Sequence, residues 1–208
     1  MLVKWITCAV VDRRGFDRGQ RRWEALRAVP GFAGQVGGWS VRDPTTAHVF
    51  AFWDSRTDHE RFLAGPHDGL AAAQADTFAR IRVRLFDERL AIREPFRPWF
   101  AGVGQLRVAH CLVHPQRVEH FTDAQVKVWN PGMGGAPGML GGVFAQAAEA
   151  EFLVLSMWAS AADHEAYRTQ RFAELRRRAA AAEDLAEVVG DLVEVEQAWS
   201  VARDSMTS

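Results

Sequence analysis

The sequence predicts an α+β fold made of two ferredoxin-like repeats, each with the element order β-α-β-β-α-β. Two observations carry this prediction. The segment FWDSRTDHERF, from Phe52 to Phe62, returns as MWASAADHEAY, from Met157 to Tyr167, which places Trp158 105 residues after Trp53. Pro-Gly turns and mid-strand cysteines recur in the same order, at offsets of 107 and 103 residues. Several landmarks in one order indicate an internal duplication.

An alternating strand opens each repeat. Over residues 2–11, and again over residues 106–114, successive side chains are assigned to opposite faces with a period of two residues, which is the period of a β-strand. An amphipathic helix follows, because side chains of one face recur at i, i+7 and i+10, and a Pro-Gly pair ends it. The helix positions are Phe16, Trp23 and Leu26 in the first repeat and Val118, Phe121, Gln125 and Val128 in the second.

A second helix and three more strands complete each repeat. Ser55-x-x-Asp58 and Ser160-x-x-Asp163 resemble capping boxes, with Asp in place of the usual Glu, and each opens a helix. The remaining strands are expected at about residues 35–42, 47–53, 141–146 and 151–158, and the closing strands are marked by Ile81, Val83 and Leu85 and by Val193, Val195, Gln197 and Trp199.

Each predicted repeat leaves one apolar sheet face uncovered. A ferredoxin-like unit is an antiparallel sheet with helices on one face, so its other face is apolar and needs a cover. One chain with two units buries both open faces against each other. The segment EPFRPW, residues 94–99, contains two prolines that resist regular structure. We therefore expect a first repeat at 1–94, a linker at 95–105 and a second repeat at 106–208, with any further oligomer built through other surfaces.

The composition is that of a folded soluble protein, with 48% hydrophobic and 25% charged residues in a chain of 208. The net charge of −1 gives no general basic field for nucleic acid, and no stretch of 18 apolar residues is present to span a membrane. Cys8 and Cys111 are too few for a disulfide framework or a thiolate zinc site, so no metal is expected. The opening MLVKWITCAVVDRR lacks a basic leader and a cleavage site, which predicts a cytoplasmic protein.

The repeated segments FAFWDSRTDHERFLAG and LSMWASAADHEAYRTQRF each join a strand ending in Trp to a capped helix, downstream of a Pro-Gly turn. This pattern resembles the antibiotic-biosynthesis-monooxygenase-like proteins and covers nearly the whole chain, once per half. The opening MLVKWITC is also similar to the uncharacterised YdbC-like bacterial proteins. The resemblance implies a dimeric α/β barrel. Because relatives form it from two identical chains, the tandem repeat implies a barrel within one chain.

The family that the chain resembles includes cofactor-independent oxygenases of aromatic substrates and haem-degrading oxygenases. The haem-degrading branch uses a first-strand Asn, a strand-end Trp and a His on the second helix. Trp53 and Trp158 match the Trp, but neither first strand contains Asn, and Arg176 falls near the histidine position of the second repeat. Haem degradation is therefore disfavoured and no cofactor is expected. Haem is not excluded, because His110 or His114 could serve as a proximal ligand.

The predicted site lies in the second repeat, because its first strand carries His110 and His114 where the first repeat has no histidine. Histidine is the side chain best suited to act as a base near neutral pH. In this hypothesis His110 is a general base or a hydrogen-bond partner of the ligand, and His114, Trp158 and His164 contribute to substrate binding. The structural alternative is that Trp158 fills the core and His164 lies at a helix start.

Two functions of different classes stay open. The first is a cofactor-independent, monooxygenase-like enzyme acting on an aromatic or otherwise apolar substrate. Such chemistry needs an electron-rich substrate, a base that makes it anionic and a dry cavity. The second is a non-catalytic protein that binds a small apolar molecule or serves as a scaffold. The residues alone leave open whether the chain is an enzyme, and an absorption spectrum with added haemin separates both functions from a haem protein.

Overall fold

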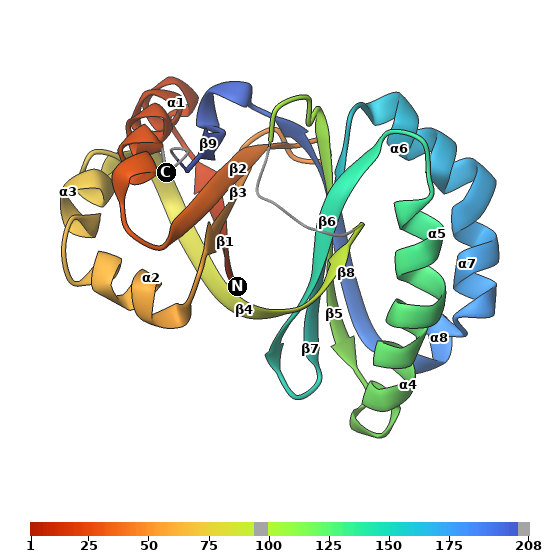
Figure 1. Ribbon diagram of the computed structural model, residues 1–208. Coiled ribbons are helices and arrows are strands. Elements are labelled where there is room, and N and C mark those ends of the chain that lie inside the picture. Colours follow the sequence, from red (N-terminus) through yellow and green to blue (C-terminus); the bar gives the residue numbers. More distant parts are fainter. Residues whose placement is uncertain (94–99, 204–208) are drawn as a thin grey trace, which may run out of the picture. The chain divides into compact units, whose positions relative to one another are not determined.

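The computed structural model describes residues 1–93 and 100–203 (Figure 1). The described residues form two compact units. Unit 1 contains those within 1–85, 98–101 and 195–208, and unit 2 contains those within 86–97 and 102–194. The segment 94–99 of the predicted linker lies outside the described residues.

Unit 1 has the predicted element order. Its strand β1 (Leu2–Val10) pairs antiparallel with β3 (Thr46–Trp53), and β3 pairs antiparallel with β2 (Phe32–Ser40). The helices lie on one side of these strands (Figure 1). They are α1 (Arg13–Arg21), which continues into the 3-10 segment η1 (Arg22–Ala28), then α2 (Arg56–Leu63), α3 (His67–Ala72) and the 3-10 turn η2 (Ala75–Thr77), after which β4 (Phe78–Ile92) begins.

Unit 2 repeats this order. Its strand β5 (Gln105–Val113) pairs antiparallel with β7 (Glu151–Trp158) and with β8 (Leu185–Val195), and β6 (Met139–Ala148) pairs with β7 and with the end of β4. The helices again lie on one side of the strands (Figure 1). They are η3 (Pro115–Arg117), α4 (Val118–Ala124), the π-helical turn η4 (Gln125–Trp129), α5 (Asn130–Gly134), α6 (Ala161–Tyr167), the π-helical turn η5 (Arg168–Phe172), α7 (Ala173–Arg178) and α8 (Ala181–Asp184).

Both predicted helix caps are confirmed, and each one is packed against the Pro-Gly turn of its repeat. The Ser55 hydroxyl accepts a hydrogen bond from the Asp58 backbone N–H at 3.1 Å and donates to the Asp58 carboxylate. Ser160 and Asp163 form the same pair of bonds. Gly31 has a φ of +79°, and a Cβ there would lie 2.3 Å from the Asp58 Cβ. The turn needs glycine both for its backbone conformation and for this close approach.

The predicted end of the second closing strand is wrong. β8 stops at Val195, residues Gln197–Trp199 form a 3-10 turn, and the two-residue strand β9 (Val201–Ala202) then pairs with β2. The physical reason is the side chain of Trp199. It is fully buried in unit 1, packs against Phe16 at a centroid distance of 5.5 Å, and donates its indole N–H to the Asp17 carboxylate at 2.8 Å. The alternation of side chains in the sequence therefore continues to Trp199, although the β-strand itself ends at Val195.

The strand-end tryptophans lie at equivalent places in the cores of the two units. Trp53 packs against the ring of Phe62, and Trp158 packs against Tyr167, each at a centroid distance of 5.0 Å. Both indoles are buried. None of the helices that the structure describes is long and apolar enough to cross a membrane.

Candidate functional site

Unit 2 contains a cavity of about 290 Å³ between its strands and helices, called here the unit 2 pocket. Its wall comes from one face of β5, from the helical segment α4–α5, from β7 and from the segments that follow α6. Most of the wall is apolar. The exposed side chains of Arg176 and Val188 mark its opening to solvent. The polar groups of the wall are Arg107, Cys111, Gln125, Tyr167 and Arg176.

Arg107 is the half-buried charged group of this pocket, whereas Arg176 is exposed. It lies on β5, on the same face as Ala109 and Cys111, which also line the wall. Its guanidinium carbon is 5.7 Å from the centroid of the Phe172 ring. Burial lowers the pKa of Arg107, because an apolar surrounding disfavours its charged form. No residue that the structure describes forms an ion pair or a hydrogen bond with this guanidinium, so the cation stands in an apolar wall without an anion.

Tyr167 offers a second unused polar group to the unit 2 pocket. Its hydroxyl is buried and has no hydrogen-bond partner among the described residues. Burial raises the pKa of Tyr167 to about 12, although Arg107 and Arg171 act in the opposite direction. The hydroxyl is therefore neutral at physiological pH and can donate a hydrogen bond to a ligand.

Gln125 is fixed within the wall by the π-helical turn. Its side-chain amide donates to the Asn130 side chain at 2.6 Å, and Asn130 donates to the carbonyl of Ala91 at 3.0 Å. Gln125 is buried, so these bonds offset the cost of removing its amide from water. The bonds connect this helical segment to the end of β4 within unit 2.

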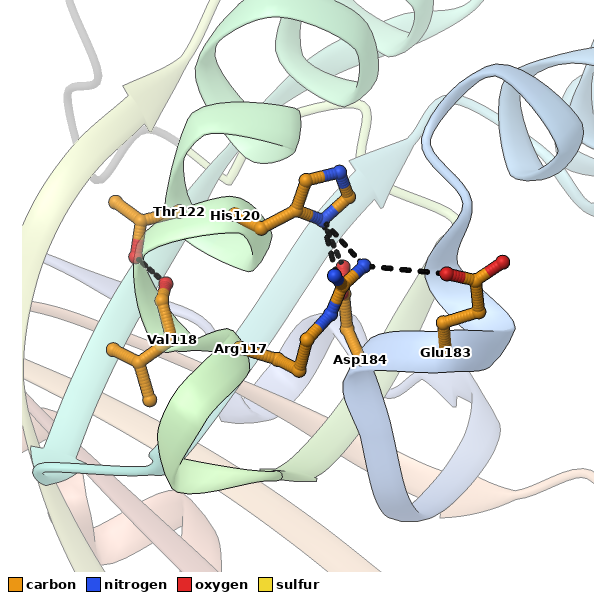
Figure 2. A network of polar contacts seen from close by, with 6 residues as sticks. All are labelled: Arg117, Val118, His120, Thr122, Glu183 and Asp184. Atoms are coloured by element: carbon orange, nitrogen blue, oxygen red, sulfur yellow. Dashed lines mark hydrogen bonds and ion pairs between the residues drawn. The ribbon is translucent and has the colours of Figure 1, made fainter.

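A polar network around the buried carboxylate of Asp184 attaches α8 to α4 beside the pocket. Figure 2 shows Arg117 and His120 turned toward the carboxylate of Asp184, which is 0% exposed. Arg117 Nε lies 2.8 Å and His120 Nδ1 lies 2.9 Å from this carboxylate. Arg117 also reaches the exposed Glu183 at 3.5 Å. Because Ala181 and Leu185 line the pocket on either side of Asp184, the network holds this part of the wall in place.

Unit 1 contains an equivalent but smaller cavity of about 200 Å³, called here the unit 1 pocket. Lys4, Ile6 and Cys8 line it from β1, as Arg107, Ala109 and Cys111 line the unit 2 pocket from β5. Each basic residue stands four positions before the cysteine. The first repeat thus has Lys4 where the second has Arg107. Phe62 of unit 1 stands where unit 2 has Tyr167.

The structure places the predicted site residues away from these walls. His110 is buried on the face of β5 opposite Arg107 and Cys111, with Nε2 2.7 Å from the Glu151 carboxylate. His114 was predicted to lie on the same strand as His110. In the structure it follows the end of β5, because the chain turns into η3 after Val113. The catalytic role of His110 and the binding role of His114 stay predictions.

Trp158 and His164 do lie together, at a centroid distance of 5.4 Å, but both are buried and neither lines the unit 2 pocket. Trp158 donates its indole N–H to the Ser156 hydroxyl at 3.0 Å. Burial, together with the nearby Arg107, lowers the pKa of His164 to about 4, so this histidine is neutral near pH 7. Their role in substrate binding also stays a prediction.

Sequence reasoning missed Arg107 and Tyr167. A signal for Arg107 was available, because a basic residue interrupts both first strands four positions before the cysteine. A basic side chain at the same mid-strand position of both repeats indicates that the two positions have a similar environment, which accommodates a charged group. Tyr167 is the only tyrosine of the chain, but its unused hydroxyl becomes visible only in the packed structure. Within the described residues, no cluster of three or more His, Cys, Asp or Glu side chains could hold a metal ion.

Sequence comparisons connect the chain to proteins without an assigned activity. A family described as a domain of unknown function, DUF4937, matches residues 2–86. The uncharacterised protein YdbC of Bacillus subtilis (strain 168) is 31% identical over 94 residues, which span 42% of this chain and 79% of YdbC.

Solved structures show a likeness over nearly the whole chain. A candidate monooxygenase of Lactobacillus acidophilus NCFM has a TM-score of 0.73 at 12% identity and covers 97% of this chain and 96% of its own. A candidate monooxygenase of Fusobacterium nucleatum has a TM-score of 0.75 at 9% identity, covering 93% and 91%. An anthrone oxidase-like protein has a TM-score of 0.68 at 18% identity, covering 100% and 95%. These likenesses confirm the predicted fold, an α+β chain of two ferredoxin-like repeats of the dimeric α/β-barrel type.

Proposed function

Because the chain belongs to the family of YdbC and has the fold of monooxygenase-like α/β barrels, we propose that its unit 2 pocket binds a small aromatic or otherwise apolar molecule in an anionic form. The function that follows is that of a monooxygenase-like enzyme in which the chain itself, through Arg107, stabilises the substrate anion. The non-catalytic alternative is binding of the same class of molecule without turnover.

The observation that carries the proposal is the unpaired guanidinium of Arg107. A buried charge is costly unless an opposite charge and hydrogen bonds compensate it. Arginine does not escape this cost by losing its proton, since its guanidinium stays charged in proteins. No described carboxylate pairs with Arg107, so a ligand that brings an anionic oxygen into the pocket relieves the cost. The Tyr167 hydroxyl adds a neutral donor for the same oxygen.

The size and lining of the pocket set the class of ligand. A cavity of about 150 Å³ with an apolar lining binds benzene. The unit 2 pocket, at about 290 Å³, is larger than this and suits a molecule of two fused rings. The flat rings of Phe121, Trp129 and Phe172 contribute to its wall and favour aromatic contact.

The same arrangement suits oxygenation of an electron-rich anion. Arg107 stabilises a phenolate or enolate form, and the apolar wall keeps water from competing for the charge. In a net monooxygenation of this kind, a methylene group and O₂ give a carbonyl group and water, so no external reductant is consumed. The described residues of the wall include no carboxylate or histidine, so the pocket's own contribution is to hold the anion.

Binding of 2-naphthoate and of naphthalene, measured by quenching of tryptophan fluorescence, tests this proposal. We expect naphthoate to bind more tightly than naphthalene, and Arg107→Met to weaken naphthoate binding by about tenfold or more, because a hydrogen bond to a charged group contributes about 1.5–3 kcal/mol. Arg177→Met is the matched control, since Arg177 is exposed on α7 and does not line the unit 2 pocket. Equal affinity for both ligands in the unaltered protein contradicts the proposal.

An oxygen electrode then separates the enzyme from the binding protein. Anthrone, whose methylene group is acidic, and 1-naphthol, which has the two fused rings that the pocket suits, are the probes, because both form electron-rich anions. Oxygen uptake that depends on the protein and falls in Arg107→Met supports the enzyme. Binding of naphthoate without oxygen uptake from anthrone or from naphthols supports the non-catalytic alternative.

A further inference from the structure

The chain contains two lysines, Lys4 and Lys127, among 25 basic residues. Lys127 is an ordinary surface lysine of unit 2, with a side chain that is 68% exposed and paired with Asp123. Lys4 is the opposite case. It lies on β1, is only 7% exposed, and lines the unit 1 pocket together with Ile6 and Cys8 of the same strand face. A chain that uses arginine almost everywhere thus has a lysine at its buried basic position.

The surroundings of Lys4 favour a neutral amine. Most of the wall of the unit 1 pocket is apolar, and no residue that the structure describes forms an ion pair or a hydrogen bond with the Lys4 ammonium. Burial lowers the pKa of Lys4. Cys8 does not supply a counter-charge, because burial raises the pKa of its thiol to about 12. A desolvated lysine without a partner is the form in which this side chain acts as a nucleophile.

The comparison with Arg107 shows why lysine matters at this place. Arginine keeps its charge in an apolar wall and needs an anionic ligand. Lysine can lose its proton, and the uncharged amine then has a free electron pair and no charge to compensate. The two repeats therefore present different chemistry at equivalent positions, a permanent cation in unit 2 and a titratable amine in unit 1.

The unit 1 pocket also has an unused hydrogen-bond donor. Trp53 lines it, and its buried indole N–H has no acceptor among the described residues. In unit 2 the equivalent Trp158 donates to Ser156, but the equivalent position in unit 1 is Ala51. The wall that contains the amine therefore contains a neutral donor suited to a carbonyl oxygen.

We infer that Lys4 forms an imine with the aldehyde or ketone group of a small apolar molecule bound in the unit 1 pocket. The amine nitrogen of Lys4 bonds to the carbonyl carbon, and the carbonyl oxygen leaves as water with the two hydrogens of the neutral amine. A C=N bond remains, and no oxidant or reductant is consumed. This inference is independent of the function proposed for unit 2.

Two histidines of unit 1 lie near Lys4 or line the same pocket. His67 lines the pocket, with Nδ1 3.0 Å from the Asp68 carboxylate. His59 interacts with Lys4 through its charge, and burial with this repulsion lowers the pKa of His59 to about 4.

Reductive trapping on the full chain tests the inference. The protein is incubated at pH 7 with benzaldehyde and sodium cyanoborohydride, and peptides are mapped by mass spectrometry, with fragment ions separating Lys4 from the N-terminal amine. We expect Lys4 to be benzylated several-fold faster than Lys127, because burial lowers the pKa of Lys4 and the pocket holds the aldehyde beside its amine. Lys127 is the control within the same molecule, so the result does not depend on whether a variant folds.

Two variants complete the test. Lys4→Arg should abolish fast benzylation, whereas Lys127→Arg should leave the rate at Lys4 unchanged. Prior addition of toluene, which fills the pocket without reacting, should slow benzylation at Lys4 and not at Lys127. Benzylation of Lys127 or the N-terminal amine as fast as Lys4, or a Lys4 rate that toluene does not change, would overturn the inference.

Discussion

Lys4 and Arg107 occupy equivalent positions in the two repeats, each on the first strand of its unit, four residues before a buried cysteine and in the wall of a pocket. Neither has a charged partner among the described residues. Duplication therefore kept a basic side chain at this place while changing its chemistry. The account of unit 2 depends on Arg107 staying charged, and the account of unit 1 depends on Lys4 losing its proton.

The network around Asp184 should be required for the stability of unit 2. Asp184→Asn removes the buried carboxylate that pairs with Arg117 and with His120 Nδ1, so we expect a loss of about 1.5–3 kcal/mol in the free energy of unfolding. Urea unfolding followed by fluorescence measures it. The matched control is Glu183→Gln, whose exposed carboxylate should contribute less than about 1 kcal/mol. Equal effects of the two variants would show that the burial of Asp184 is not the source of its contribution.

Acid should destabilise the protein through two buried histidines. Burial lowers the pKa values of His59 and His164 to about 4, from the ordinary value of 6.5. At pH values between about 4 and 6.5, both histidines bind a proton in the unfolded chain but not in the folded protein. Their contribution to stability is therefore complete above pH 6.5 and is lost as the pH falls from 6.5 toward 4, on the order of 2–3 kcal/mol for each histidine.

The test compares urea unfolding at several pH values between 7 and 4.5 for the unaltered protein and for His59→Phe and His164→Phe. Each variant should show a shallower fall in unfolding free energy with acid, because it removes one proton-binding group from the unfolded chain. Carboxylates titrate equally in all three proteins, so the difference in slope isolates the histidines. Parallel curves for all three proteins would show that neither histidine has a lowered pKa.

The two strand-end tryptophans should differ in their response to the same substitution. Trp158→Phe removes the hydrogen bond to Ser156, whereas Trp53→Phe removes an N–H that has no acceptor among the described residues. Because the change of shape is the same, we expect Trp158→Phe to cost about 1–2 kcal/mol more than Trp53→Phe. Thermal and urea unfolding measure the difference. A larger cost for Trp53→Phe would mean that its indole N–H has a partner in solution.

Much of the fold is accessible from the sequence because its landmarks have local physical causes. Gly31 and Asp58 belong to separate motifs in the sequence, yet they lie in contact, since only glycine fits beside the capping aspartate. The repeat of both motifs therefore reports a repeated tertiary contact. Trp199 shows the limit of local patterns. Its alternation predicts a strand, but a partner 182 residues away, Asp17, decides where its indole lies.

The candidate site was less predictable, for a different reason. Alternation along β5 separates His110 from Arg107, but it does not say which face meets the helices. Histidine was favoured because it titrates near neutral pH, and the structure gives His110 a carboxylate partner, Glu151, on the other face. The chemistry proposed for the pocket comes instead from two groups that have no hydrogen-bond or ion-pair partner among the described residues. They are the guanidinium of Arg107 and the hydroxyl of Tyr167. The sequence marks the position of Arg107 by the basic residue four positions before each cysteine, but the missing partners are a property of packing.

The central claim, that Arg107 stabilises an anion in the unit 2 pocket, is tested most directly by the pKa of a bound phenol. The absorbance of 1-naphthol distinguishes its neutral and anionic forms, so a pH titration with excess protein gives the pKa of the bound ligand. The account predicts that this pKa lies about one to two units below that of free 1-naphthol, as a hydrogen bond to a charged donor contributes about 1.5–3 kcal/mol, and that Arg107→Met abolishes the shift. A bound pKa equal to or above the free value in the unaltered protein would contradict the account.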